Sequence, residues 1–303
     1  MTRRFLLSII VVLLITNVAT LLLWSRDGEQ QVVDIGDGEK EVDRKKAVAT
    51  IGKEEISFDE WMQAMRNTHG ERQLKGMIDR EVVSQLAHKK DIKVHDKVIE
   101  REIAYLTSMQ GIRSKKEMEK QITKWKSDIV YRYQLEALLT EDVRIPEEEL
   151  KAYFDGYHKQ YDFSTSIQLS HIVVNDMETA KKVKRELDEG ASFALLAREY
   201  TTDEESKKDG GYLGYFTETS QFLPDGYYDQ ALNMKQHTYS EPFAVGNGAA
   251  IIYLHRFIPE IQFSYEELKP YIKSELALEK MEQSLTADPL WKELKVDWIY
   301  NEK

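Results

Sequence analysis

The chain has 303 residues, 42% of them hydrophobic, and a formal net charge of −11. This length allows about two domains, and the apolar fraction is sufficient for a buried core. The acidic balance argues against binding to a nucleic-acid backbone, which requires a basic surface. Because the chain has no cysteine, it forms no disulfide, thiolate metal site, cysteine nucleophile or cysteine-linked lipid anchor.

The first long feature is an uncharged apolar stretch over residues 5–24. A helix of about 20 residues crosses a bilayer, whereas the core of a cleavable signal peptide spans about 7–15 residues and is followed by an A-x-A pattern. No such pattern follows here, so residues 1–26 are predicted to be an uncleaved transmembrane anchor rather than a signal peptide or a buried helix. Arg3 and Arg4 predict a cytoplasmic N-terminus and an extracytoplasmic main part at the cell membrane.

The part beyond the anchor is strongly acidic. Residues 1–26 hold three arginines and no acid, which leaves 39 basic and 53 acidic residues outside and a net charge of −14. Anionic lipid should repel this part. Residues 27–46 are charged and contain few large apolar side chains, which is typical of a linker. We expect the folded part to hang from this linker.

Residues 47–163 are predicted to form a helical region. Ser57 and Glu60 fit a capping box that begins the first helix. From Trp61 to Leu139 the composition favours helix throughout, so several short helices separated by glycines are expected. The expected breaks are at Gly70, Gly76 and Gly111. A further helix is predicted to begin near Pro146, followed by three glutamates that suit a helix N-terminus.

The pattern changes at Ser164. The alternating, β-branched segment "SIQLSHIVV" predicts a strand, and two short helices are predicted over residues 177–190 and 192–201. The glycine-rich segment "GGYLGYF" predicts another strand, and a Gly246–Gly248 turn is predicted to join two more. This order of elements predicts a compact α+β domain over residues 164–258.

A second capping box, Ser264 with Glu267, predicts that residues 259–303 form a helical tail. The tail is expected to extend to about Lys295, with a kink at Pro270 because proline disrupts a helix interior.

Three motifs in the α+β domain resemble the parvulin family of peptidyl-prolyl isomerases. They are "LSHIVV" at 169–174, "GASFALLAREYTTDEESKKDGGYLGYF" at 190–216 and "YSEPFAVGNGAAIIYL" at 239–254. The wider layout is similar to the extracytoplasmic foldases of Gram-positive bacteria, in which the C-terminal helix returns to the helical region. The resemblance implies a small antiparallel sheet with surrounding helices and no cofactor. The remaining histidines lack the spacing of metal ligands.

The resemblance also implies the residues of a site. His171 matches the family's strand histidine beneath the substrate, and Asp203 matches the position held by cysteine or aspartate beside the rotating bond. The cup for the proline ring is expected to consist of Leu213, Phe216, Leu223 and Tyr227. The glycine pair before Tyr212 should let the strand pass close beneath this site.

Two positions depart from the family pattern. The second core histidine falls on Ala250, and the hydroxyl residue that normally bonds to the histidine pair falls on Val245. Half of the expected polar network is therefore absent from the motifs.

The chemistry needs no proton transfer. Rotation about an X–Pro bond breaks amide resonance and crosses a barrier of about 18–20 kcal/mol, so a catalyst has only to bind the twisted amide better than the planar one. We expect a peptidyl-prolyl isomerase that acts on unfolded or partly folded exported polypeptides. The alternative is a chaperone that binds such polypeptides without turnover, and a third possibility is an envelope assembly factor with a dedicated partner.

Overall fold

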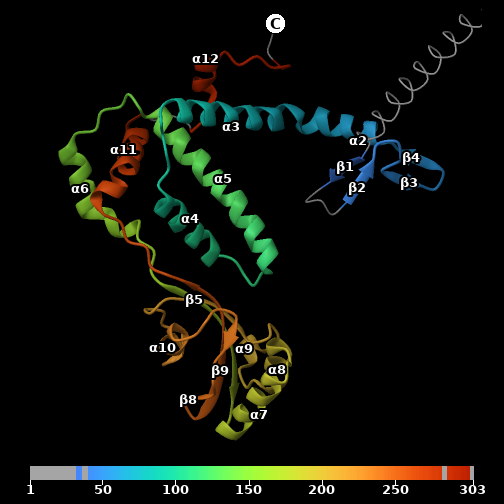
Figure 1. Ribbon diagram of the computed structural model, residues 1–303, viewed down its shortest axis with the longest axis vertical. Helices are drawn as coiled ribbons and strands as arrows, with labels where there is room; N and C mark the ends of the chain where they lie inside the picture. The colour runs from blue at the N-terminus through green and yellow to red at the C-terminus, as the bar shows by residue number, and fades with distance from the viewer. Residues whose placement is uncertain (1–31, 36–39, 282–284, 301–303) are drawn as a thin grey trace, which may run out of the picture. The chain divides into compact units, whose positions relative to one another are not determined.

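The computed structural model describes residues 32–35, 40–281 and 285–300 (Figure 1). The predicted anchor and the expected cytoplasmic tail lie outside these residues. Within the described part, no helix is both long and apolar enough to span a membrane. The chain divides into two compact units, one running to Ile78 and resuming at Asp297, and the other made of Asp79–Val296.

The first unit contains two antiparallel hairpins. They are formed by β1 (Val32–Ile35) with β2 (Lys40–Asp43), and by β3 (Ala49–Ile51) with β4 (Glu54–Ile56). The first hairpin lies in the range predicted to be a linker, so part of that range has regular structure. The predicted capping box of Ser57 and Glu60 is present and begins helix α2 (Phe58–Met65).

The glycines of the helical region separate helices less often than predicted. A π-turn, η1 (Arg66–Gly70), leads from α2 directly into α3 (Glu71–Lys89), and Gly76 lies inside α3. The predicted break at Gly76 is therefore wrong, because a long helix tolerates a glycine at a cost of about 1 kcal/mol. Gly111 does separate α4 (Asp96–Ser108) from α5 (Lys115–Leu139).

We call α4, α5, α6 (Glu147–Tyr157) and α11 (Tyr265–Met281) the helical lobe. Its core brings together Val98 from α4, Leu150 from α6 and Ile272 from α11. The capping box of Ser264 and Glu267 is confirmed at the start of α11, with Ser264 N–H donating to the glutamate at 2.8 Å. The C-terminal helix therefore completes a core that begins about 170 residues earlier in the chain. The short elements around the lobe are η2 (His158–Gln160), η3 (Asp288–Leu290) and α12 (Trp291–Leu294).

The α+β domain is built on an antiparallel sheet of five strands in the order β6-β5-β9-β7, with β8 also paired to β9. The strands are β5 (Ser166–Val174), β6 (Tyr212–Phe216), β7 (Thr238–Tyr239), β8 (Phe243–Val245) and β9 (Gly248–Ile258). The helices are α7 (Met177–Asp188), α8 (Phe193–Tyr200), α9 (Glu204–Lys207) and α10 (Tyr227–Leu232). The α+β class agrees with the sequence prediction, as do strands β5, β6, β8 and β9 and helices α7 and α8, whereas the short elements α9, α10 and β7 were not predicted.

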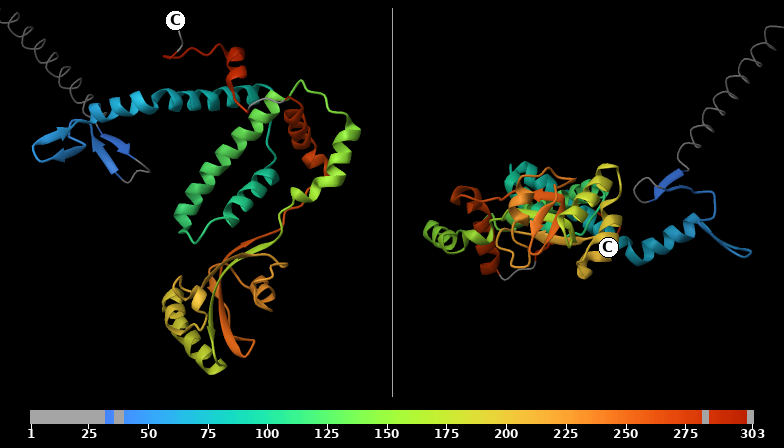
Figure 2. Two further views of the ribbon diagram at one scale, coloured as in Figure 1. Left: turned by 180° about the vertical axis from the view of Figure 1, so that it is seen from behind. Right: turned by 90° about the horizontal axis from the view of Figure 1, so that it is seen from below.

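The sheet has a separate apolar core on each face, because side chains alternate along β5. Ile172 and Val174 pack with Val183 of α7 and Leu196 of α8 on one face. Ile167 and Leu169 pack with Tyr227 and Ala231 of α10 on the other. Figure 2 shows the long strands β5 and β9 running together between these helices.

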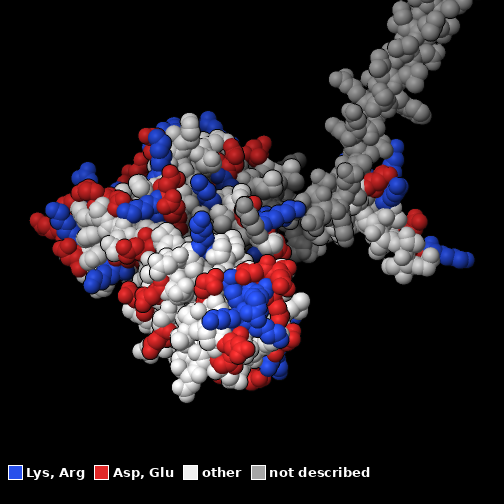
Figure 3. Space-filling model, turned by 60° about the horizontal axis from the view of Figure 1, so that its bottom comes forward, with Lys and Arg blue, Asp and Glu red and all other residues white. Residues whose placement is uncertain are grey.

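The surface charge is mixed rather than uniformly acidic where it can be seen. Figure 3 shows lysine and arginine side chains gathered among aspartates and glutamates on one face, beside a continuous uncharged area.

Candidate active site

His171 lies near the middle of β5 and belongs to the face that packs against α10. The alternation of side chains puts it on the same face as Leu169, and opposite to Ile172. Only 6% of its side chain is exposed. Its backbone N–H donates to the carbonyl oxygen of Gly211 at 2.8 Å, which ties β5 to the glycine pair. The imidazole is therefore held in a fixed place beside the predicted cup.

Asp203 reaches His171 from the loop between α8 and α9. The distance between His171 Nε2 and Asp203 Oδ2 is 2.8 Å. Asp203 is also the N-cap of α9, and its Oδ1 accepts the N–H of Glu205 at 3.3 Å. Its side chain is 28% exposed. The structure thus brings together the two residues that the sequence predicted for the polar part of the site, the histidine buried and the carboxylate reaching the surface.

Ser206 is a third polar member that the sequence analysis missed. Its hydroxyl donates to Asp203 Oδ2 at 2.5 Å, and its backbone N–H donates to the same oxygen at 3.3 Å. Its Oγ also lies 3.2 Å from His171 Nε2. In the segment "DEES", Asp203 and Ser206 have the spacing of an N-cap residue and position N3 of a helix. This spacing predicts the hydrogen bond from the Ser206 backbone N–H to the Asp203 carboxylate.

Burial and hydrogen bonding set the charges of the pair. Burial lowers the pKa of His171, although the hydrogen bond and the charge of Asp203 act in the opposite direction. Burial acts to raise the pKa of Asp203, but hydrogen bonds from Ser206 and His171 outweigh it, and the pKa falls below its ordinary value. At neutral pH the pair is therefore an uncharged imidazole beside a carboxylate.

The four residues predicted for the cup lie in one apolar cluster on the α10 face. Leu213, Phe216 and Leu223 are partly buried and pack against its core, so part of each side chain faces outward. Tyr227 differs because it is fully buried, at 0% exposure. Of the four predicted cup residues, only the first three therefore contribute exposed apolar surface, and whether they hold a proline ring stays a prediction.

The glycine pair explains how the site is closed from beneath. A Cβ atom on Gly211 would lie 2.1 Å from the carbonyl oxygen of His171, and one on Gly210 would lie 2.7 Å from the Ala194 Cβ. Both glycines also have positive φ, at +68° for Gly210 and +79° for Gly211. The predicted close approach of the strand is confirmed.

The residue at the position of the family's second histidine, Ala250, is part of the apolar core. Ala250 is fully buried, pairs with Val173 of β5 and with Phe243 of β8, and belongs to the same cluster as Tyr227. His171 Nδ1 nevertheless has a partner, because the Tyr227 hydroxyl lies 3.0 Å from it. The motifs predict Tyr227 as part of the cup wall and do not predict this hydrogen bond.

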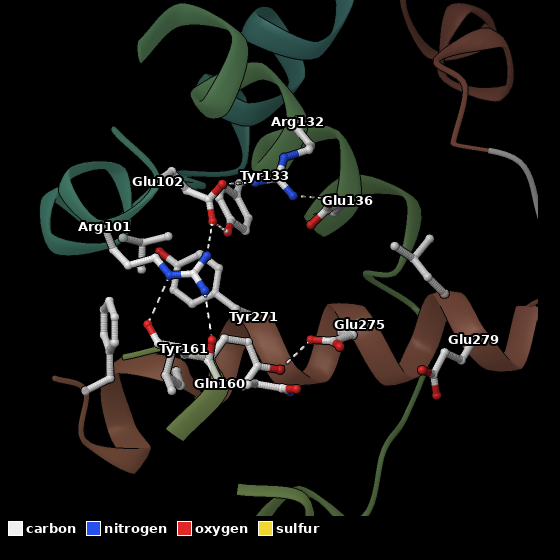
Figure 4. Close-up of a pocket in the computed structure, with 14 residues that line it drawn as sticks. Arg101, Glu102, Arg132, Tyr133, Glu136, Gln160, Tyr161, Tyr271, Glu275 and Glu279 are labelled. Atoms are coloured by element: carbon white, nitrogen blue, oxygen red, sulfur yellow. Dashed lines mark hydrogen bonds and ion pairs between the residues drawn. The ribbon is translucent and has the colours of Figure 1, made fainter. Parts of the chain in front are cut away.

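A separate polar cavity of about 530 Å³ lies in the helical lobe between α4, α5 and α11 (Figure 4). Glu102 is its main acceptor, taking hydrogen bonds from Arg101 at 2.6 Å, Arg132 at 3.0 Å and Tyr133 at 3.1 Å. Burial raises the pKa of Glu136, which faces the cavity from α5. This cavity shares no residue with the His171 site. Within the described ranges, no cluster of three or more His, Cys, Asp or Glu side chains has the arrangement of a metal site.

Comparison with known proteins gives related sequences over most of the chain. Residues 145–270 match the family of PPIC-type PPIASE domains. The protein YacD of Bacillus subtilis (strain 168), whose name assigns it provisionally to the peptidyl-prolyl cis-trans isomerases, is 35% identical over 85% of this chain and 86% of its own length. The foldase protein PrsA of Geobacillus kaustophilus is 29% identical over 93% of this chain and 88% of its own length.

Among solved structures, the crystal structure of the peptidylprolyl isomerase PrsA from Bacillus cereus is similar to this chain. It is 24% identical, and the match covers 85% of this chain and 95% of that one with a TM-score of 0.33. Because this score is low, the family assignment depends on the sequence relatives.

Proposed function

The chain belongs to the parvulin-type peptidyl-prolyl cis-trans isomerases related to the PrsA foldases, and we propose that it isomerises X–Pro bonds in exported polypeptides through the His171 site. The observation that carries this proposal is the His171 Nε2 to Asp203 Oδ2 hydrogen bond of 2.8 Å beside a partly exposed apolar cluster. The foldase relatives support exported, incompletely folded polypeptides as substrates.

The mechanism follows from what prolyl isomerisation requires. The partly exposed side chains of Leu213, Phe216 and Leu223 hold the proline ring, while the rest of the peptide turns. Loss of amide resonance in the twisted state changes the polarity of the carbonyl oxygen and the prolyl nitrogen. A carboxylate at a fixed position beside this bond interacts differently with the twisted and planar forms, and that difference lowers the barrier. His171 and Ser206 keep the Asp203 carboxylate in place.

The direct test is the refolding of a protein whose slow step is proline isomerisation, measured with the purified full chain and with Asp203→Ala. We expect wild type to accelerate the slow phase and Asp203→Ala to lose on the order of tenfold or more of that acceleration, because a hydrogen-bonded charge is removed. Asp209→Ala is the matched control, since Asp209 is exposed and lies outside the described site. Equal acceleration by wild type and Asp203→Ala would rule out the proposed role of this carboxylate.

A second function, binding of unfolded polypeptides without turnover, is favoured by the alanine at the position of the second histidine. It predicts that the full chain suppresses aggregation of a denatured substrate and leaves the slow refolding phase unchanged. Measuring both properties on the same preparation separates the two functions. If Asp203→Ala suppresses aggregation as well as wild type does but no longer accelerates refolding, the chain performs both functions at different places.

The proposed location is the outer face of the cell membrane, with residues 1–26 as the anchor. The uncharged stretch of residues 5–24 and the two preceding arginines support this arrangement. Protease added to intact cells from which the wall has been removed should degrade the main part of the chain. Full protection of the chain in these wall-free cells, with degradation only after lysis of the membrane, would contradict the proposed orientation.

A further inference from the structure

The fully buried Tyr227 has a polar contact that an apolar cup residue does not need. It lies at the start of α10, and its hydroxyl is 3.0 Å from Nδ1 of His171. The two rings meet edge to face, with centroids 5.8 Å apart and an interplanar angle of 72°. Because Tyr227 is 0% exposed, its ring has no free surface on which a substrate proline could pack.

The neighbouring residues compensate for the missing second histidine. Ala250 leaves only a methyl group on this face of β9, and its register partner Phe243 is partly buried in the same cluster. The Phe243 ring packs edge to face on Tyr227, with centroids 5.5 Å apart. A small residue on β9 is therefore combined with large rings on β8 and α10, and the large ring on α10 brings a hydroxyl group to the imidazole.

The hydrogen bonds around His171 are consistent with one tautomer only. An ionised Asp203 can only accept, so His171 Nε2 must carry the proton that is donated to Asp203 Oδ2. In a neutral imidazole the other nitrogen is then an acceptor, so Tyr227 donates its hydroxyl proton to Nδ1. Tyr227 can do this because burial raises its pKa and keeps it protonated.

We propose that Tyr227 is a positioning residue that replaces the second histidine: its hydroxyl donates to Nδ1 of His171 and holds the imidazole ring in the orientation in which Nε2–H donates to Asp203. The chain of donors runs from Tyr227 to His171 and from His171 to Asp203. The catalytic consequence of this hydrogen bond rests on the proposed isomerase function. The hydrogen bond itself depends only on the geometry of the buried pair.

The test is Tyr227→Phe in the full chain, which removes one oxygen and keeps the ring. ¹⁵N NMR of the His171 side chain should show the Nε2–H tautomer in both proteins, because Asp203 still accepts from Nε2. The Nδ1 resonance should move downfield in the variant, because that nitrogen loses its hydrogen-bond donor. The kcat for isomerisation should fall about three- to tenfold, the effect of losing one neutral hydrogen bond. KM should stay within about twofold because the partly exposed apolar residues are unchanged.

Tyr215→Phe is the matched control. The Tyr215 hydroxyl is also buried, and among the residues that the structure describes it has no hydrogen-bond partner. Removing it should change neither the His171 Nδ1 resonance nor kcat. A loss of activity in this variant equal to that of Tyr227→Phe would show that loss of any buried tyrosine hydroxyl in this domain affects activity through stability alone, and would overturn the proposal.

The two readouts separate the two claims. If the His171 Nδ1 resonance is the same in wild type and Tyr227→Phe, the proposal is wrong whatever the activity. If this resonance moves and kcat does not change, the catalytic part is wrong. If wild type itself shows no isomerase activity, the proposed function fails, and the NMR comparison still decides whether Tyr227 fixes the imidazole.

Discussion

At the scale of single residues, the α+β domain holds a buried histidine, His171, and a partly buried one, His255, in different electrostatic surroundings. His171 has a carboxylate partner, which opposes the effect of burial on its pKa. His255 is instead hydrogen-bonded to the Ser170 hydroxyl at 2.8 Å. Burial, with smaller effects from His237 and Arg256, lowers the pKa of His255 to about 4. The partly buried His255, outside the site, should therefore make the domain sensitive to acid.

We predict that His255→Gln reduces the acid sensitivity of this domain. An unfolded histidine takes up a proton below pH ~6.5, whereas folded His255 does so only near its pKa of about 4. In that window the unfolded state binds more protons, so the free energy of unfolding falls as pH falls, by about 1.4 kcal/mol per unit and about 3 kcal/mol in total. Urea unfolding at several pH values should give a smaller slope for the variant. The exposed His88→Gln serves as control, and an unchanged slope in His255→Gln would contradict the assignment.

The polar residues of the site were partly predictable from the sequence. The motifs identified His171 and Asp203, because a strand histidine and a loop acid keep their spacing to the glycine pair. They did not reveal that Tyr227 contacts Nδ1, since this hydrogen bond joins residues 56 positions apart. Its only sequence signal is a tyrosine at the position where the family usually has phenylalanine, together with alanine at position 250. Motif matching treats the tyrosine at 227 and the alanine at 250 as independent differences, whereas the two residues pack in the same buried cluster.

At the scale of elements, local signals predicted the helix starts near Ser57, Pro146 and Ser264, and the predicted break at Gly76 was wrong. Both capping boxes are present because each satisfies backbone N–H groups within four residues of sequence. Glycine occurs in different backbone conformations in this chain: Gly76 continues a helix, whereas Gly211 has φ +79° and lies against β5. The difference depends on distant neighbours, so the sequence of either segment does not contain it.

We predict that Gly76→Ala and Gly211→Ala have opposite effects on stability. Around Gly76 nothing lies within 4 Å of the added Cβ, so alanine should stabilise α3 by about 1 kcal/mol through helix propensity. At Gly211 the Cβ would lie 2.1 Å from the His171 carbonyl oxygen, so alanine should cost more than about 3 kcal/mol or prevent the domain from folding. Thermal unfolding followed by circular dichroism measures both changes. A stable Gly211→Ala protein with full isomerase activity would contradict the close approach.

At the scale of the whole molecule, the helical lobe is assembled from two separate stretches of chain. The α+β domain is inserted between α6 and α11, and α11 contributes Leu268, Ile272 and Leu276 to the core of the lobe. The capping box of Ser264 and Glu267 predicted that the C-terminal tail is helical, but not where it packs; that expectation came from the resemblance to foldases. Non-local packing of this kind is set by the shape of the partner surfaces, which a single sequence does not display.

We predict that the core of the helical lobe and the sheet core that faces α7 and α8 respond separately to mutation. Ile272 is fully buried in the helical lobe, and Ile251 is fully buried in the α+β domain. Replacement of either isoleucine by alanine should lower the free energy of unfolding by about 2–5 kcal/mol. Because the two cores share no buried residue, Ile272→Ala should increase hydrogen exchange mainly in α4, α6 and α11, and Ile251→Ala mainly in β5 and β9. Hydrogen exchange read by mass spectrometry distinguishes the two patterns. Uniform acceleration over both regions in either variant would mean that they unfold as one cooperative unit, and isomerase activity would then depend on the helical lobe being intact.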